Sequence, residues 1–408
     1  MGKLLASTAI LVLLFWVTPA VWSAEWRAGV DLGQTSGKVR EPWIEGGVGK
    51  FGDTADEGFL QGYLELKHRI NDVTHLEIVG ELSDTSRQPW VGVTEAFLQW
   101  RPVPTSRYRW QAKVGMFYPP VSLENDNDGW RSRHTRSFSA INSWIGEEVR
   151  TLGTQFSVEW RPWQMHSGRL QLGGALFMGN DPAGTLLAWR GWSSHAQQSR
   201  WADDLPLQAL PQFQQGRFFA DQNPYVEPFK EIDNRPGFYA FAQWRLPRRL
   251  VVKAMHYDNL AKPTALEGGQ YAWQTRFDAL GVRTEVAGFE LISQWMKGST
   301  LMGSRWEATA NFRSVFALVA KQFGEHRIAL RYEDSLVRQF DNTPQDNNDE
   351  TTDGLTVSYG WQINSHWQLQ AEWQRQRTWR PGWMYANLTP RADEALWQLG
   401  LHWRSKRR

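Results

Sequence analysis

The sequence contains no cysteine among its 408 residues. This absence excludes disulfide bonds, thiolate metal ligands, cysteine nucleophiles and a lipid-modified N-terminal cysteine. The chain also has little excess charge, with 45 Lys and Arg against 43 Asp and Glu. Nucleic-acid binding needs a basic surface, so this balance argues against nucleic acid as a partner. Long apolar runs are missing beyond the N-terminus, which excludes a bundle of membrane-spanning helices.

The one long apolar run has the features of a secretory signal peptide. Lys3 supplies a positive charge, Leu4 to Val17 form an apolar core, and Val21-Trp22-Ser23 precedes the predicted cleavage point. A membrane anchor is the alternative, but this core is short for a spanning helix of roughly 20 residues. We therefore predict a signal peptide over residues 1–23 and an exported mature chain.

The mature sequence alternates between apolar and polar residues. Along 366–377 the two kinds occupy opposite parities, with Trp367, Leu369, Ala371 and Trp373 against Gln368, Gln370, Glu372 and Gln374. Successive side chains of a strand point to opposite faces, so such segments predict strands with one apolar and one polar face. A soluble antiparallel sandwich would show the same alternation, and the connections must decide between the two folds.

Short and long connections alternate along the chain. Seven short turns and eight longer loops bracket 16 predicted strands between about Trp43 and Trp403. Outer-membrane barrels have short turns at the periplasmic end and long loops at the outer end. We therefore predict an all-β fold, a 16-stranded antiparallel transmembrane β-barrel with long outer loops, over residues 43–408. Residues 24–42 would then form an N-terminal leader in the periplasm or the lumen.

Tryptophan is abundant, with 25 residues in the chain. Seven of them lie beside the predicted short turns, on the apolar parity of their strands: Trp100, Trp110, Trp160, Trp244, Trp361, Trp367 and Trp403. Aromatic girdles occupy this position in membrane barrels, at the level of the lipid headgroups. Core packing in a soluble protein is the alternative interpretation. The pattern favours a location in the outer membrane of a Gram-negative cell.

A barrel of 16 strands has room for an aqueous channel. The inward parity carries both signs of charge, which predicts a wet lumen without a strong single-sign filter. The basic lumen-lining candidates are Arg109, Lys113, Arg169, Arg245, Lys253, Arg327 and Arg331. Solvated side chains that merely line the bore are the plainer interpretation of each.

Loop 118–148 is long enough to fold inward and narrow the bore. The pore-constriction candidates within it are Arg131, Arg133, Arg136, Glu124, Glu147 and Glu148. An exposed loop over the rim is the alternative. Loop 179–235 is the longest connection, and its many aromatics indicate a packed plug, a subunit contact or a sugar-stacking surface. The sequence leaves open which of the two loops forms the constriction.

Signals for catalysis and for cofactors are weak. The run 125–129 carries oxygen ligands at alternate positions before a glycine, which suits a hard cation, but an acidic turn is the interpretation we favour. No GxSxG, HExxH or P-loop motif occurs. We therefore predict no enzyme activity, no cofactor and no bound metal.

The segment 114–124, Val-Gly-Met-Phe-Tyr-Pro-Pro-Val-Ser-Leu-Glu, ends a predicted strand and opens the long loop 118–148. It resembles the phosphate-selective porins O and P, in which a similar strand end leads into a Pro-x-Ser-Leu-Glu-type loop. The resemblance implies an export signal, 16 strands and a long third loop. The family's loop carries lysines and its lumen an arginine ladder that conducts anions, whereas loop 118–148 here has no lysine.

The sequence as a whole favours an outer-membrane porin for passive diffusion of small hydrophilic solutes or ions, with anions as candidates. An outer-membrane enzyme or receptor, which would use the barrel as a platform for loop 179–235, is the alternative. The expected partners are the lipid bilayer and small hydrophilic solutes, and a homotrimer is a candidate assembly.

Overall fold

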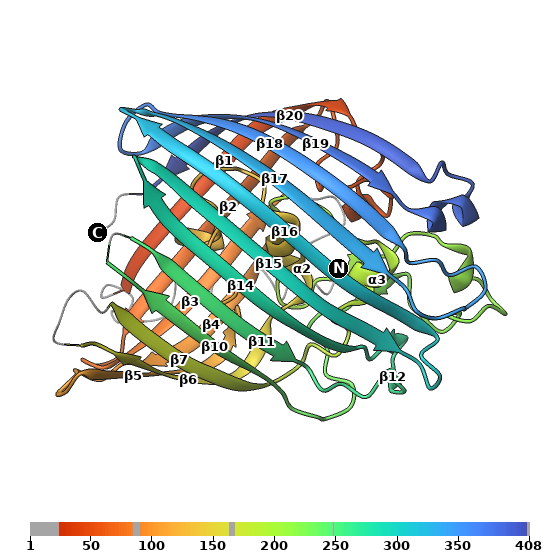
Figure 1. Cartoon of the computed structure of the whole chain (residues 1–408), viewed down its shortest axis with the longest axis horizontal. Helices are drawn as coiled ribbons and strands as arrows, with labels where there is room; N and C mark the ends of the chain where they lie inside the picture. Colours follow the sequence, from red (N-terminus) through yellow and green to blue (C-terminus); the bar gives the residue numbers. More distant parts are fainter. Residues whose placement is uncertain (1–23, 85–89, 163–167, 248, 406–408) are drawn as a thin grey trace.

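The fold is a closed barrel of 16 antiparallel strands, seen from the side in Figure 1. The computed structural model describes residues 24–84, 90–162, 168–247 and 249–405, so the predicted signal peptide lies outside the described residues. The barrel strands are β1 (Ala24–Lys38), β2 (Gly58–Arg69), β3 (Thr74–Ser83), β4 (Val91–Trp100), β5 (Tyr108–Phe117), β6 (Thr151–Trp160), β7 (Arg169–Met178), β10 (Gly237–Arg245), β11 (Val251–Asp258), β14 (Gln274–Val286), β15 (Phe289–Met302), β16 (Ala308–Phe323), β17 (His326–Arg338), β18 (Glu350–Gln362), β19 (Trp367–Trp379) and β20 (Arg391–Arg404).

The first strand lies elsewhere than the sequence predicts. Residues 24–38, expected as part of a leader, form β1 and close the barrel by pairing with both β2 and β20. Residues 39–57, which include the expected first strand near Trp43, form a loop with a 3₁₀ helix, η2 (Trp43–Glu45). The reason is physical: β1 keeps its alternation, with Trp26 and Leu32 outside, whereas the Trp43 side chain is buried.

The remaining elements lie in the loops at the end opposite the short turns. Two are α-helices, α2 (Ala140–Glu148) and α3 (Thr185–Trp189). The others are η3 (Asp128–Trp130), η5 (Pro211–Phe213), η6 (Pro381–Ala386), and the short hairpins β8 (Leu205–Pro206) with β9 (Tyr225–Val226) and β12 (Leu266–Glu267) with β13 (Gln270–Tyr271). Among the described residues, no helix has the length and apolar character needed to cross a membrane.

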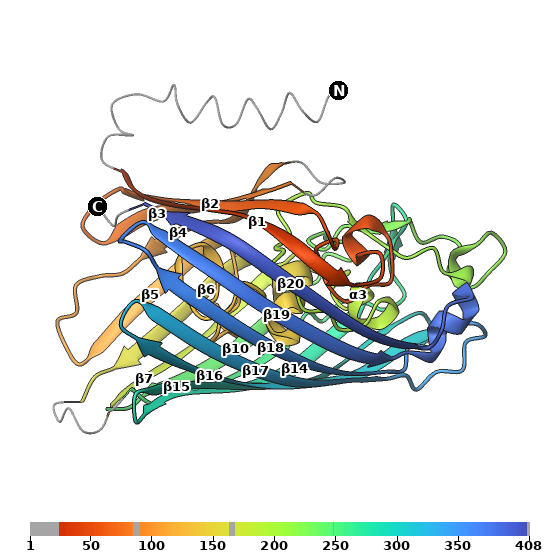
Figure 2. The same ribbon diagram turned by 90° about the horizontal axis from the view of Figure 1, so that it is seen from above.

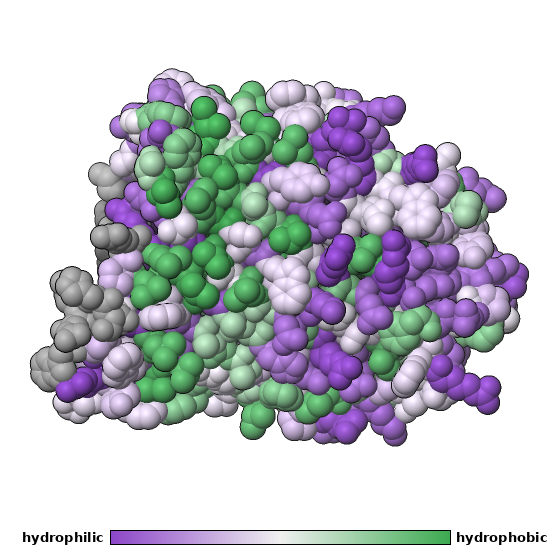
Figure 3. Space-filling view, viewed as in Figure 1, coloured by the Kyte–Doolittle hydropathy of each residue, from purple (hydrophilic) through white to green (hydrophobic). Residues whose placement is uncertain are grey.

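The barrel wall is taller on one side than on the other. Strands β3 to β11 of the barrel have 8 to 10 residues, whereas β14 to β20 have 13 to 16. Figure 3 shows an apolar band over the half of the molecule nearer the short turns and a hydrophilic surface beyond it. The outward-facing tryptophans next to the short turns include Trp100, Trp110 and Trp244, each 40–46% exposed. The band and its aromatic border fit a membrane-spanning barrel.

The inside of the barrel contains a hydrophobic core. The indole of Trp144, on α2, packs edge-on against the rings of Phe277 and Phe312 on the wall, with centroids 5.4 and 5.3 Å away. The ring of Trp192, from the loop after β7, lies 6.1 Å from the same indole. Loops with their own apolar side chains therefore pack onto an apolar stretch of the inner wall, as the core of a soluble domain would.

Candidate functional site: the lumen and its plug

Two loops enter the barrel. The third loop (residues 118–150, between β5 and β6) carries α2, and the fourth loop (residues 179–236, between β7 and β10) carries α3. Figure 2 shows both helices within the outline of the barrel. Every residue of α2 and of α3 is buried. We call residues 118–150 and 183–200 of these loops, most of which are buried, the plug. The sequence left open which loop narrows the bore, and the structure places both there.

The plug is anchored to the inner wall through Arg331 on β17. Its guanidinium donates to the carboxylate of Glu124 at 2.8 Å and to that of Glu333 at 3.3 Å. The Glu124 carboxylate in turn accepts hydrogen bonds from the Ser139 backbone at 3.0 Å and the Asn142 side chain at 2.7 Å, at the start of α2. The Arg331 and Glu124 side chains are fully buried, so the pair is shielded from solvent.

Two of the three predicted constriction arginines are also tied to the wall. Arg131 donates to Glu81 at 3.0 Å and to Asp31 at 3.3 Å. Arg136 donates to Asp53, in the first loop, at 2.8 Å and to the side chain of Gln61, on β2, at 3.3 Å. These guanidiniums therefore fasten the plug, because their charge is matched by carboxylates within hydrogen-bond distance.

Arg133 lies differently from the other two arginines. Its side chain is 51% exposed, and its guanidinium lies 3.4 Å from the Asp126 carboxylate. Asp126 also pairs with Arg283 of β14. Asp128 in turn pairs with Arg27. Both carboxylates of the 125–129 run, considered above as a cation site, therefore contact arginines.

Glu147 joins the two loops to each other. Its two oxygens accept hydrogen bonds from the Arg190 guanidinium at 2.7 and 2.6 Å, and His195 Nε2 lies 2.7 Å from the same carboxylate. Burial by itself raises the pKa of a carboxyl, but Arg190 and His195 outweigh it and lower the pKa of Glu147 to about 2. Glu147 is therefore ionised, and its buried carboxylate bridges the loops by contacting both Arg190 and His195.

Glu148 caps the helix of the other loop. Its carboxylate accepts hydrogen bonds from the backbone N–H groups of Leu186 at 2.8 Å and Leu187 at 3.3 Å, at the N-terminal end of α3. The Trp144 indole donates to it at 2.6 Å. Burial raises the pKa of Glu148 to about 7, even though these hydrogen bonds favour the ionised form. Its charge therefore changes close to neutral pH while it holds the two loops together.

The inner wall next to the short turns is accessible and charged. We call this space, below the plug, the vestibule. Arg109, Arg169 and Arg245 lie in it on β5, β7 and β10, and Arg245 and Arg169 are directly opposite each other in the register of β7 and β10. Arg245 is 48% exposed and lies 3.1 Å from the Glu159 carboxylate. The structure thus gathers three of the lumen-lining candidates into one basic arc.

The other lumen-lining candidates lie at different depths. The Lys113 ammonium sits 4.4 Å from the centre of the Phe97 ring, near the arc. Lys253 is buried and donates to the backbone carbonyl of Ser122 in the third loop at 2.9 Å. Arg327 donates to the backbone carbonyl of Arg133, and Arg331 belongs to the plug anchor and not to an open channel lining.

Sequence reasoning missed the part played by the first loop. The Lys50 ammonium is buried and donates to Glu350 at 2.7 Å and to the Arg190 carbonyl at 2.9 Å. Burial lowers the pKa of Lys50 to about 8, although Glu350 opposes the shift. Arg380 donates to the same Glu350 at 3.1 Å. No spacing in the sequence relates these four positions, because Lys50, Arg190 and Arg380 come from three different loops and Glu350 begins β18.

A column of planar side chains crosses the plug. The rings of Trp130 and Tyr118 stack with centroids 4.1 Å apart. The Arg150 guanidinium lies 3.5 Å from the Tyr118 ring and 5.2 Å from the Phe229 ring, whose other neighbour is the exposed Trp201 at 6.4 Å. The aromatic richness of the two loops was visible in the sequence, but the stacking order was not.

Three carboxylates of the fourth loop, those of Asp181, Glu231 and Asp233, place oxygens within 4.8 Å of one another. Burial raises the pKa of Asp181 to about 7. Backbone N–H groups supply partners, since Ile232 donates to Asp181 at 2.6 Å and Gly179 to Glu231 at 2.7 Å. The cluster is an acidic turn whose oxygens are largely satisfied by the backbone.

Comparisons with known proteins support the fold. No protein-family model matches the chain, and no curated protein matches its sequence. Among solved structures, a loop-deletion mutant of OmpT, an outer membrane protein of Vibrio cholerae, has a TM-score of 0.54 at 7% identity, covering 94% of this chain and 99% of that one. The outer membrane channel DcaP of Acinetobacter baumannii has a TM-score of 0.52 at 8% identity, covering 94% and 96%.

A third similar structure is an anion-selective porin from Comamonas acidovorans, with a TM-score of 0.52 at 10% identity, covering 94% of this chain and 99% of that one. At these identities the likeness concerns the fold. The chain is thus a 16-stranded barrel of the outer-membrane type.

Proposed function

We propose that the chain is a porin-type channel of the outer membrane that passes small hydrophilic solutes or ions by diffusion and prefers anions. The observation that carries the proposal is the basic vestibule beneath a plug built from two loops. A lumen of this width is more than wall side chains alone would fill. The fold likeness to a channel and to a porin supports the same class.

The preference for anions rests on the vestibule arc. Arg245 pairs with Glu159, and Arg109 lies opposite Glu159 in the register of β5 and β6. Arg161 also contacts Glu159, at 2.5 Å, and Arg169 lies opposite Arg245, so the arc keeps a positive excess. Low-dielectric walls focus such a charge onto passing ions and raise the local concentration of anions. The resemblance of 114–124 to phosphate-selective porins agrees with this sign of charge.

Passage through this barrel requires movement of the plug. Its ion pairs and aromatic packing fill the lumen between the vestibule and the outer loops, as the burial of Trp144, Trp192 and Glu147 indicates. In the proposed channel the plug has a docked and a displaced arrangement, and conduction belongs to the displaced one. The proposed channel is therefore gated and rests in its closed state.

Planar-bilayer recording of the purified protein tests the proposal. Wild-type protein should show brief stepwise openings, and Trp192→Ala, which removes a buried plug contact, should lengthen them. Trp201→Ala is the matched control, because Trp201 is 47% exposed and lies outside the plug core. Absence of steps in both wild type and Trp192→Ala protein would contradict a channel.

Reversal potentials in a salt gradient test the preference for anions separately. Wild-type channels should favour anions, and Arg169→Glu with Arg245→Glu should move the reversal potential toward cation preference. The control is Arg217→Glu, an exposed residue of the fourth loop that belongs to none of the vestibule strands. An unchanged reversal potential in the double variant would remove the role assigned to the arc.

A receptor that uses the barrel as a platform is the second candidate. The hydrophobic core of the plug favours it, because Trp144, Trp192 and Phe312 pack as tightly as the interior of a soluble domain. A platform predicts no conduction even after Trp192→Ala, so the same recording separates the two functions.

A further inference from the structure

The outer face of the tall wall carries a row of charged residues. Asp334 of β17 lies opposite Asp353 of β18, which lies opposite Arg377 of β19, which lies opposite Asp393 of β20. All four share the outward parity of their strands, since the neighbouring positions Glu333, Thr352 and Glu394 are buried inside. The row therefore faces the surroundings of the barrel and has no part in the channel.

The row lies at the outer border of the apolar band. Nearer the short turns, the outward-facing positions of β19 and β20 are apolar: Trp373 lies opposite Trp397, and Leu369 lies opposite Leu401. Arg377 lies eight positions beyond Leu369. That separation is about 27 Å along the strand at about 3.4 Å per residue, or roughly 20 Å of height for a strand tilted by about 40°. The charges thus stand where hydrocarbon ends and lipid headgroups begin.

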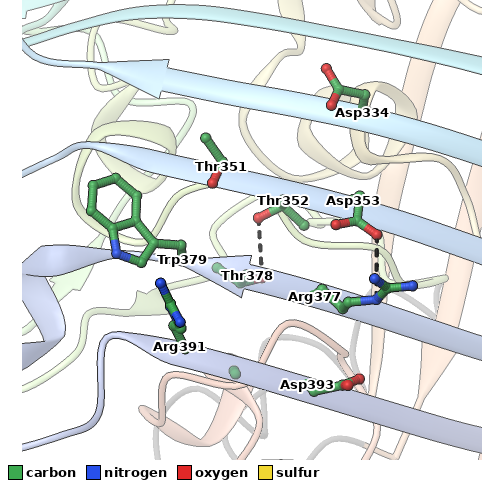
Figure 4. Close-up of a pocket in the computed structure, with 10 residues that line it drawn as sticks. Asp334, Thr351, Thr352, Asp353, Arg377, Thr378, Trp379, Arg391 and Asp393 are labelled. Atoms are coloured by element: carbon green, nitrogen blue, oxygen red, sulfur yellow. Dashed lines mark hydrogen bonds and ion pairs between the residues drawn. The ribbon is translucent and has the colours of Figure 1, made fainter.

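A pocket of about 460 Å³ opens at this level, and Figure 4 shows its lining. Trp379 and Thr351 stand next to it at the outer end, and the Arg391 side chain extends toward the Trp379 ring. Asp353 and Arg377 form its other side, joined by an ion pair of 3.7 Å. The pocket therefore combines one indole, two guanidiniums and carboxylates at the headgroup level.

The charges of the pocket are only partly neutralised by each other. Arg375 is held by two hydrogen bonds to Asp393, at 2.8 and 2.6 Å. Within the described residues, the Arg391 guanidinium forms no hydrogen bond or ion pair of its own. Asp334 stands opposite Asp353, and like charges in direct cross-strand pairs destabilise a sheet. A ligand that offers both an acid and hydroxyl groups would satisfy both ends of the pocket.

We infer that this pocket binds the phosphorylated saccharide headgroup of a lipid in the outer leaflet. Arg391 and Arg377 supply planar donors for a phosphate group, the geometry in which guanidinium binds it best. Trp379 offers an aromatic face to the sugar ring, and Asp334 and Asp353 accept hydrogen bonds from its hydroxyls. The acyl chains of the same lipid would lie on the apolar band below, against Leu355, Trp373 and Trp397. This inference concerns the outer wall and goes beyond the proposed passage of solutes.

Lipid binding to the purified full-length chain tests the inference. Lipid A is the probe, because it is an acylated glucosamine disaccharide with phosphate groups, and bound copies are counted by native mass spectrometry. The double variant Arg377→Ala with Arg391→Ala should bind lipid A about ten-fold more weakly, a difference of about 1.4 kcal/mol. The matched control is Arg276→Ala with Lys297→Ala, two outward-facing basic residues of β14 and β15, which should leave binding unchanged.

A second variant keeps the test informative if the double variant folds poorly. Arg391→Gln removes a guanidinium without an internal partner, so the barrel should form normally while lipid A binding falls. Phosphatidylglycerol, which has a phosphate but no saccharide, should bind weakly to every variant. Equal binding of lipid A by wild type and Arg391→Gln, or equal binding of phosphatidylglycerol and lipid A by wild type, would overturn the assignment.

Discussion

The guanidinium of Arg190 and the carboxylate of Glu147 form a two-bond ion pair, at 2.7 and 2.6 Å, between the two loops inside the barrel. Their side chains are 3% and 1% exposed. Neither loop alone could bury its charge without the other, because an unpaired ion in a dry interior is strongly unfavourable. The loops therefore dock as one plug, and this coupling determines the outcomes expected below.

Removing Arg190 should destabilise the docked plug. Arg190→Leu leaves the Glu147 carboxylate buried with only His195 beside it. Breaking a buried ion pair in this way should lower the stability of the docked plug by about 3–5 kcal/mol. We expect faster proteolysis within residues 183–200 and longer channel openings. Arg217→Leu, in an exposed part of the same loop, should alter neither. Equal protease resistance of Arg190→Leu and wild type would show that the pair does not hold the plug.

The three arginines of the third loop should respond differently to charge reversal. Arg133→Glu changes an exposed side chain beside the vestibule, so it should shift the reversal potential toward cations and leave stability nearly unchanged. Arg131→Glu places a carboxylate against Glu81 and Asp31, so it should lower the thermal stability of the plug. Thermal unfolding and reversal potential, measured on both variants, separate the two effects. If Arg131→Glu shifted the reversal potential and Arg133→Glu lowered the thermal stability, Arg131 and not Arg133 would lie in the conducting path.

Opening should increase as pH rises toward neutrality. The pKa of Glu148 is raised to about 7 in the docked plug, above the value of about 4.3 for a free glutamate. Protonated Glu148 therefore favours the docked plug, and this stabilisation is complete below about pH 4.3. It is lost as pH rises through about 7 and the carboxyl ionises. Open probability should therefore rise between about pH 5 and pH 8. Glu148→Gln should flatten the profile, whereas a pH profile identical to wild type would exclude Glu148 as its source.

The lipid-facing parity can be checked by placing a charge at mid-membrane. Leu399 is 53% exposed on the outer face of β20, between the rows of Leu401 and Trp397. Leu399→Arg should cost about 2–4 kcal/mol of stability, read by unfolding in lipid vesicles. Gln111→Arg is the control, because Gln111 faces the vestibule on β5. A larger loss for Gln111→Arg than for Leu399→Arg would mean that the inside and outside of the wall are exchanged.

Much of the barrel could be predicted from the sequence alone. The alternation in 366–377 and the tryptophans beside short turns depend on local geometry, since a strand places successive side chains on opposite faces whatever its partners are. The number of strands agreed with the prediction, but the position of the first strand did not. The alternation of 24–38 is interrupted by glycines and is therefore weaker than the aromatic signal near Trp43. Which segment forms the first strand is decided by its pairing with β20, which closes the barrel. That pairing depends on the whole sheet and not on the local sequence.

The sequence by itself determined which residues face the membrane and which loops are long enough to enter the bore. Only the tertiary structure decided what those loops do there. Glu147 meets Arg190 across 43 positions and Glu124 meets Arg331 across 207, and no local pattern relates residues so far apart. The face on which a strand residue lies follows from the local geometry of the strand. The ion pairs of the plug form only because two loops are buried together inside the barrel. That is why the wall could be predicted and the contacts of the plug could not.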